Sequence, residues 1–191
     1  LFLHLAGDEE GNGSGHKRQR EDQRRRQGQH DGDRHGMEGF ALDAFKRIDV
    51  IDILEKDSEQ QHKFRIVDAK DKYRTRQKLK YPDGVIVEDT GIAYEGGYAE
   101  WEISNVTPNR DLYMFMRMDY VHGGWECEIS VNGKKTGSMV CEGEDRKFRW
   151  RNWPYKIPAE YVTDTFLTIR QTPNSADRDV KGLAKIFTVK S

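Results

Sequence analysis

Aromatic and basic side chains are concentrated in one short segment, Arg146–Pro158, which reads RKFRWRNWPYKIP. Aromatic rings stack on the flat faces of sugars, and arginine and asparagine side chains hydrogen-bond to hydroxyl groups or acidic groups. The segment therefore holds the residue types of a ligand-binding platform. The candidate ligand-binding residues are Trp153, Tyr155, Arg149, Arg151 and Asn152.

The same aromatic residues also fit the core of a β-protein. Phe148 and Trp150 alternate with arginines, which predicts a short strand with its aromatics inside and its arginines outside. Because Pro154 lacks an N–H, we expect this strand to end before it and Trp153 and Tyr155 to lie in a turn at the sandwich edge. There the two rings either cap the open end of the core or stay exposed and stack on a ligand.

From the turn signal Tyr81-Pro82-Asp83-Gly84 onward, the chain reads as short strands separated by glycine, proline and asparagine. This pattern predicts an all-β fold, a two-sheet antiparallel β-sandwich of jelly-roll-like form, at residues 81–191. The expected strands are Val85–Asp89, Tyr98–Ile103, Asp111–Tyr120, Trp125–Val131, Thr136–Cys141, Phe148–Arg151, Phe166–Gln171 and Leu183–Lys190.

Two regions precede the sandwich. Residues 1–36 mix charges of both signs and have almost no apolar residue after Leu5, so we expect a disordered polar tail. Residues 37–80 form a lead-in segment.

The lead-in segment contains three predicted pieces. Ala41–Glu55 has apolar residues at a helix-like spacing but also alternates like a strand, so either a short helix or a strand fits. Phe64–Val67 is a short strand candidate, and Lys70–Lys80 reads as a polar, basic connection.

The faces of two predicted strands can be assigned. In Trp125–Val131, every second residue is apolar, which indicates one face on the core and one in solvent. Leu112–Met118 is apolar on both faces, so it is expected to be a central strand or one whose second face is covered.

The dipeptide Asn132-Gly133 is a strong hairpin signal that favours a type I′ turn. A two-residue loop would place Cys127 opposite Ser138 and turn Cys141 to the other face, so a disulfide is disfavoured unless a bulge shifts the register. We expect two free thiols, with Cys127 buried.

Charge and hydropathy narrow the classes of partner. The formal net charge of −1 argues against nucleic acid as a main ligand, since phosphate binding needs a cationic excess. No apolar run approaches the roughly 20 residues of a membrane-spanning helix, and the opening LFLHLAG is too short for a signal-peptide core. Neither nucleic acid nor a membrane is an expected partner.

Evidence for catalysis is weak in the sequence. The pairs Glu100/Glu102 and Glu126/Glu128 share strand faces, and two carboxylates about 5–10 Å apart suit glycoside hydrolysis, but a solvated strand face explains them more simply. No nucleophile motif or phosphate loop is present. We expect no enzyme activity; a small lyase or hydrolase using Glu100 and Glu102 is the weakest hypothesis.

Metal or cofactor binding has little support either. The histidines at 4, 16, 30 and 35 fit no compact ligand set, and His62 and His122 have no partner at ligand spacing. Oxygen ligands at Glu142, Glu144 and Asp145 suit calcium, but their spacing matches no calcium loop. We expect no cofactor.

The run Leu112–Arg170 resembles the C-terminal β-sandwich modules, jelly-roll and galactose-binding-like, of relatives of the glycoside hydrolases that act on α-fructofuranosides and α-arabinofuranosides. The matching elements are the hairpin Val131–Lys134, the segment Arg149–Ala159 and the strand Leu167–Arg170. The catalytic domain of those hydrolases has no counterpart here. The resemblance thus implies an accessory, glycan-associated sandwich in an extracellular or cell-surface setting.

Two functions follow as hypotheses. The first is a non-catalytic carbohydrate-binding β-sandwich, whose poly- or oligosaccharide stacks on the edge aromatics and hydrogen-bonds to arginine and asparagine. The alternative is a self-assembling jelly-roll subunit of a filament, shell or surface layer, in which the N-terminal arm reaches a neighbouring copy.

Overall fold

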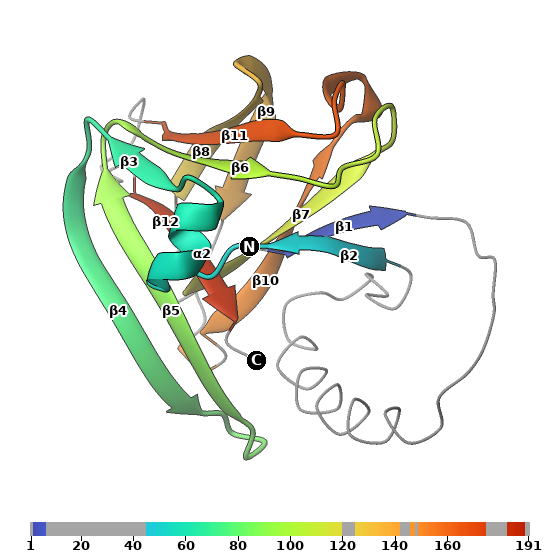
Figure 1. Cartoon of the computed structure of the whole chain (residues 1–191). Coiled ribbons are helices and arrows are strands. Elements are labelled where there is room, and N and C mark those ends of the chain that lie inside the picture. Colours follow the sequence, from blue (N-terminus) through green and yellow to red (C-terminus); the bar gives the residue numbers. More distant parts are fainter. Residues whose placement is uncertain are drawn as a thin grey trace, which may run out of the picture.

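The computed structural model describes residues 2–6, 45–119, 125–141, 146–147, 149–174 and 183–189, which form an all-β sandwich of two antiparallel sheets (Figure 1). The predicted tail beyond residue 6, His122, Phe148 and the residues Glu142, Glu144 and Asp145 lie outside these ranges. One short helix, α2 (Lys56–Gln61), lies between strands β2 and β3 in the described sequence.

Sheet A has seven strands in the described residues, and it runs along the left side and lower half of Figure 1. The main path is β2-β1-β7-β12-β5-β4, with β10 paired to the other side of β7. The strands are β1 (Phe2–Ala6), β2 (Phe45–Val50), β4 (Lys70–Lys80), β5 (Ile86–Glu95), β7 (Leu112–Asp119), β10 (Trp150–Ile157) and β12 (Leu183–Val189).

Among the residues that the structure describes, sheet B has five strands in the order β3-β6-β11-β8-β9, and it lies across the top of Figure 1. Tyr94 connects the two sheets, because its hydroxyl donates to the Gln171 carbonyl (3.0 Å) and accepts from the Ala99 N–H (3.1 Å). The strands are β3 (Arg65–Val67), β6 (Tyr98–Ile103), β8 (Trp125–Val131), β9 (Lys134–Cys141) and β11 (Leu167–Pro173).

The core lies between the sheets and confirms the predicted strand faces. On β8 the alternate residues Trp125, Cys127, Ile129 and Val131 are all buried, whereas Glu126 is exposed. Cys127 is a free thiol, as predicted, and its sulfur accepts a hydrogen bond from the amide of the buried Gln171 (3.2 Å).

The prediction that Leu112–Met118 is a central strand is also confirmed. As β7, it pairs with β10 along one edge and with β1 and β12 along the other. Met114 and Met116 are buried on the core side, and Phe115 and Arg117 are buried on the opposite side.

The β8–β9 hairpin has the predicted turn but a different register. Asn132 and Gly133 both have positive φ, and Val131 pairs with Lys134. Thr136 of β9 is an extra residue opposite the step from Ile129 to Ser130, and this bulge shifts the ladder by one residue.

Because of this bulge, Cys127 lies opposite Met139, and the expected pairing with Ser138 is wrong. Cys141 pairs through its backbone with Trp125. The Cys141 side chain lies outside the described part of the chain.

The structure chooses between the alternatives left open in residues 1–80 and corrects two other predictions there. Of the helix and the strand that both fitted Ala41–Glu55, the strand is confirmed as β2 at residues 45–50, and the helix α2 begins only at Lys56. Lys70–Lys80 is not a connection but an eleven-residue strand. Residues 2–6, assigned to the disordered tail, form β1 between β2 and β7.

The expected end of a strand before Pro154 is wrong as well. Strand β10 begins at Trp150 and continues through Pro154 to Ile157, and Pro154 pairs with Phe115 of β7. Within the described residues, β10 has a ladder with β7 alone, so it is an edge strand. An edge strand tolerates proline because the missing N–H can face away from its neighbour.

The β4–β5 turn and the start of β10 are held together by Tyr81. The Tyr81 hydroxyl accepts a hydrogen bond from the Trp150 N–H (2.8 Å) and donates one to the Trp150 carbonyl (3.0 Å). Both residues are buried, with Tyr81 2% exposed and Trp150 0% exposed. This contact joins two edges of sheet A that are separated by three strands in the sheet.

Removing that hydroxyl should destabilise the fold. In Tyr81→Phe, two buried backbone groups of Trp150 lose this partner, so we expect the free energy of unfolding to fall by about 2–4 kcal/mol. Urea unfolding of the two proteins measures the difference. Tyr155→Phe is the matched control, with an expected loss of about 1 kcal/mol because its hydroxyl lies in a partly buried site. Equal losses in the two variants would contradict this role of Tyr81.

Candidate functional site

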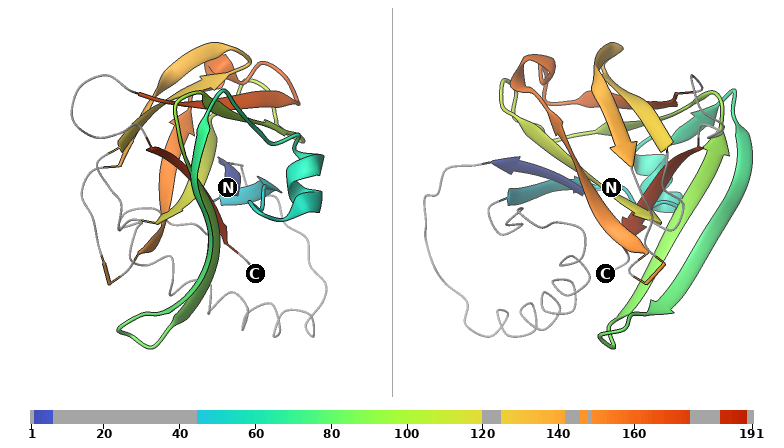
Figure 2. Two further views of the ribbon diagram at one scale, coloured as in Figure 1. Left: turned by 90° about the vertical axis from the view of Figure 1, so that its left-hand side faces the viewer. Right: turned by 180° about the vertical axis from the view of Figure 1, so that it is seen from behind.

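Trp153 and Tyr155 lie on β10, at the edge of sheet A seen from behind in Figure 2. They pair with Met116 and Met114 of β7, and paired residues share a face of the sheet, so both rings face the core. Both are partly buried and pack against the core cluster. The rings are thus partly inserted at the edge of the sandwich and are not wholly enclosed.

The Tyr155 hydroxyl connects the edges of the two sheets. It lies 2.9 Å from the Thr136 Oγ1 of β9, the last strand of sheet B. The Thr136 hydroxyl donates its hydrogen to the Ile129 carbonyl (3.0 Å), so Tyr155 must be the donor in the contact between them. Burial raises the pKa of Tyr155, and its hydrogen bond with Thr136 only partly opposes this, so the phenol stays neutral.

The bulge on β9 makes room for this contact. Gly137 has φ +153°, and a Cβ atom there would lie 2.9 Å from the Tyr155 hydroxyl oxygen. Glycine is therefore needed both for its backbone angle and for the space it leaves. Bulges of this kind are frequent at sheet edges and beside functional sites, where they redirect a side chain.

The other predicted site residues do not all join these rings. Arg149 is partly buried immediately before β10, and the side chain of Arg151 lies outside the described part of the chain. Asn152 lies on the opposite face of β10, paired with Arg117 of β7, and is 3% exposed.

Asn152 belongs to a buried polar cluster. Its Oδ1 accepts a hydrogen bond from Arg117 Nη1 (3.4 Å), and Arg117 Nε also donates to Asp89 Oδ2 (3.0 Å). Sequence alternation alone places Asn152 away from its neighbours Arg151 and Trp153, and this signal was available before the structure. Trp153 and Tyr155 therefore lie on one face of β10, and Asn152 lies on the opposite face.

The outer face of sheet B carries the predicted Glu100/Glu102 pair. Glu100 Oε1 accepts from Arg65 Nε (3.0 Å), and its Oε2 accepts from Arg170 Nε (2.9 Å) and Nη2 (2.7 Å). Burial alone would raise the pKa of Glu100, but the two arginines outweigh it and hold that pKa below its usual value. Glu102 pairs with Lys63 (2.7 Å).

A general acid must hold a proton near neutral pH, so the charge environment of Glu100 does not suit that role. Arg170 also stacks over the Tyr98 ring at 4.0 Å. The face is an ordered set of ion pairs, and the solvated strand face expected from the sequence is wrong for Glu100, which is buried (7% exposed) between its two arginines.

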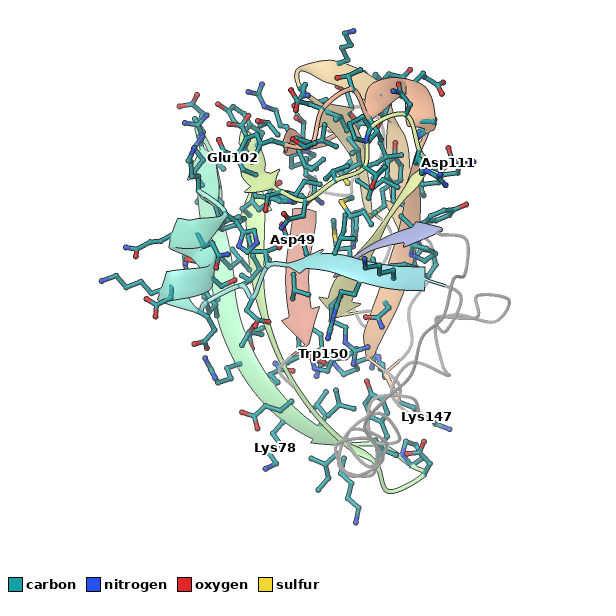
Figure 3. The ribbon with its side chains drawn as sticks, turned by 45° about the vertical axis from the view of Figure 1, so that its right-hand side comes forward. Asp49, Lys78, Glu102, Asp111, Lys147 and Trp150 are labelled. Carbon is teal, nitrogen blue, oxygen red and sulfur yellow. The ribbon has the colours of Figure 1, made fainter. Side chains whose placement is uncertain are left out.

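His62 has an acidic partner that its sequence neighbourhood did not reveal. Its Nε2 lies 3.0 Å from Asp49 Oδ1, and its Nδ1 lies 2.6 Å from the Ser58 carbonyl. Both partners accept hydrogen bonds, so both ring nitrogens must donate, which requires the imidazolium form. Asp49 also accepts from the Ser104 N–H (3.0 Å), so the cluster connects β2, α2 and the end of β6 (Figure 3).

The pKa values of this pair follow the geometry. Burial by itself would lower the pKa of His62, but the hydrogen bonds to Asp49 and Ser58 raise it above its usual value overall. Burial would raise the pKa of Asp49, but the contacts with His62 and Ser104 lower it.

Two other kinds of site are absent from the part of the chain that the structure describes. It contains no group of three or more His, Cys, Asp or Glu side chains placed to hold a metal ion. None of its helices has the length and apolar character needed to cross a membrane.

Comparison with known proteins gave no relative. No protein-family model matches the chain, and neither the curated proteins nor the solved structures contain a match.

The His62–Asp49 pair should make stability depend on pH. Because the folded pKa of His62 is raised above the unfolded value of about 6.5, protonated His62 stabilises the fold fully below that pH. This contribution is lost as the pH rises through the folded pKa. We expect His62→Gln to lower the free energy of unfolding much more at about pH 6 than at about pH 9, by urea unfolding. A difference that does not change with pH would refute the imidazolium assignment.

Proposed function

We propose that this β-sandwich is a non-catalytic carbohydrate-binding module whose ligand contacts Trp153 and Tyr155 at the edge of β10. The observation that carries the proposal is the contrast among the tryptophans. Trp101, Trp125 and Trp150 are 0%, 3% and 0% exposed, whereas Trp153 remains partly exposed beside Tyr155. A ring at a sheet edge that keeps an accessible surface suits stacking on a sugar.

Polar groups near the rings support a hydroxyl-rich ligand. Lys135 and Thr136 lie at the β9 bulge, and Lys135 forms an ion pair with Glu128 (2.8 Å) on the exposed face of the hairpin. A few polar groups around an aromatic surface are the usual composition of a small-ligand site. Asn152, buried against Arg117, is left out of the proposed site.

The non-catalytic part of the proposal is supported by the carboxylates of sheet B. Glu100 is held ionised between Arg65 and Arg170, and Glu102 is paired with Lys63. Glycoside hydrolysis needs one carboxyl group that keeps its proton until it reaches the leaving oxygen. The two arginines hold the pKa of Glu100 below its usual value, so Glu100 does not suit that role.

A glycan-array screen of the full chain tests the proposal. We expect binding to a poly- or oligosaccharide that Trp153→Ala with Tyr155→Ala weakens by about 10-fold or more, because stacking on the rings is lost. Phe166→Ala is the matched control. It removes another exposed ring (43%), which lies just before β11 and outside β10, so it should leave binding unchanged. No binding on the array, or equal loss in the control, would overturn the proposal.

A second candidate function is self-assembly by strand exchange. Residues 2–6 form β1, which is inserted between β2 and β7, and the long segment 7–44 separates it from β2 in the sequence. The same strand from a neighbouring copy would make the same ladder, as in strand exchange between protomers.

Light scattering over a range of protein concentrations tests this second function. Exchange of β1 predicts a dimer or larger assembly that grows with concentration and is lost when residues 1–6 are deleted. A monomer at every concentration would exclude it.

A further inference from the structure

Strand β4 forms an unpaired edge of sheet A within the described residues. It pairs with β5 along Lys70–Lys80 and is the last strand in the sheet order. The β4–β5 hairpin runs down the left side of Figure 1 and down the right side of the rear view in Figure 2. A long edge strand presents outward backbone N–H and C=O groups to which another strand can add.

The exposed side chains of this edge form a row of one charge. After a register shift between Asp71 and Tyr73, the exposed residues alternate with partly buried ones. Alternate residues on a strand share a face and lie about 7 Å apart. The exposed, basic members of the row are Arg74, Arg76, Lys78 and Lys80; Figure 3 shows Lys78 on the outer side of the hairpin.

Two acidic residues lie beside this row. Arg76 forms an ion pair with Glu55 (2.7 Å), and Glu88 of β5 lies opposite Lys78. Arg76 and Lys78 thus each have one acidic residue of the chain beside them. Glu88 lies on the β5 side of β4, so it does not occupy the side on which a new strand would add.

The charge pattern decides which strand can pair with this edge. A second copy of β4 would place cations directly opposite cations, which destabilises a ladder. A strand with an acid at every second position has the same two-residue period and would place each acid opposite a cation. Addition of a second copy of β4 to this edge is therefore disfavoured, and addition of a strand of opposite charge is favoured.

We propose that β4 is a strand-addition site for an extended acidic segment of a partner protein, with Glu or Asp at alternate positions opposite Arg74, Arg76, Lys78 and Lys80. The added strand would receive main-chain hydrogen bonds from β4 and pair its acids with the basic row. This inference does not rest on glycan binding at β10. Its competing explanation is that the lysines and arginines only prevent edge-to-edge aggregation.

The probe for the first test is a peptide of alternating Glu and Thr, about seven residues long with Glu at both ends, which matches the length of the row and its four cations. The control peptide has the same composition with its glutamates in one block. With the full chain, we expect fluorescence anisotropy to show binding that weakens with salt, about 10-fold tighter for the alternating peptide. Amide hydrogen exchange should show new protection in β4.

A charge swap gives the second test. Lys78→Glu with Lys80→Glu should weaken the acidic peptide about 10-fold and create binding of an alternating Lys-Thr peptide. Lys46→Glu with Lys134→Glu, two exposed lysines on β2 and at the β8–β9 turn, is the matched control and should change neither. If circular dichroism shows that the double glutamate variant is not folded, Lys78→Gln with Lys80→Gln takes its place in the test with the acidic peptide.

Three outcomes would overturn the proposal. The first is the absence of peptide binding, which would leave the row as protection against aggregation. The second is equal binding of the alternating and block peptides. The third is binding of heparin or peptide without protection of the β4 amides, which would identify a general polyanion surface instead of a strand site.

Discussion

Strand β7 carries apolar side chains on both faces, and such a strand is stable only when both faces are covered and both edges are paired. The structure meets this requirement by placing sheet B over Met114 and Met116 and by pairing β7 with β10, β1 and β12. On the opposite face, Arg117 is buried as an ion pair with Asp89 and a hydrogen bond to Asn152. Breaking one member of such a pair leaves a buried charge, so β5, β7 and β10 are fixed relative to one another.

Sheet A then has two edges of different character. At β10, Pro154 removes a backbone donor, and Trp153 and Tyr155 lie toward the core with part of each ring accessible. At β4, the exposed residues between positions 74 and 80 are Arg74, Arg76, Lys78 and Lys80, which all carry a positive charge. Tyr81 joins the ends of these two edges through hydrogen bonds to the Trp150 backbone, although the edges are far apart in the sequence.

The sequence predicted the sandwich, the core face of β8 and the central position of β7 correctly, because burial of a strand leaves a two-residue period of apolar residues. It failed for β4, since an exposed edge strand of lysines and arginines has no apolar alternation to reveal it. It also failed at Pro154, because the rule that proline ends a strand does not hold at an edge. The Thr136–Gly137 bulge shifted Cys127 from Ser138 to Met139, and the partner of His62 is Asp49, thirteen residues away. Contacts set by tertiary packing leave no local signal.

The central claim is that Trp153 is an accessible ring that a glycan can cover, and quenching of tryptophan fluorescence by acrylamide measures this directly. The other three tryptophans are buried, so the quenchable emission should come from Trp153 and disappear in Trp153→Phe. The account predicts that an added oligosaccharide protects this emission from the quencher. Emission from Trp153 that no quencher reaches, or that stays equally quenchable in the presence of every glycan tested, would contradict it.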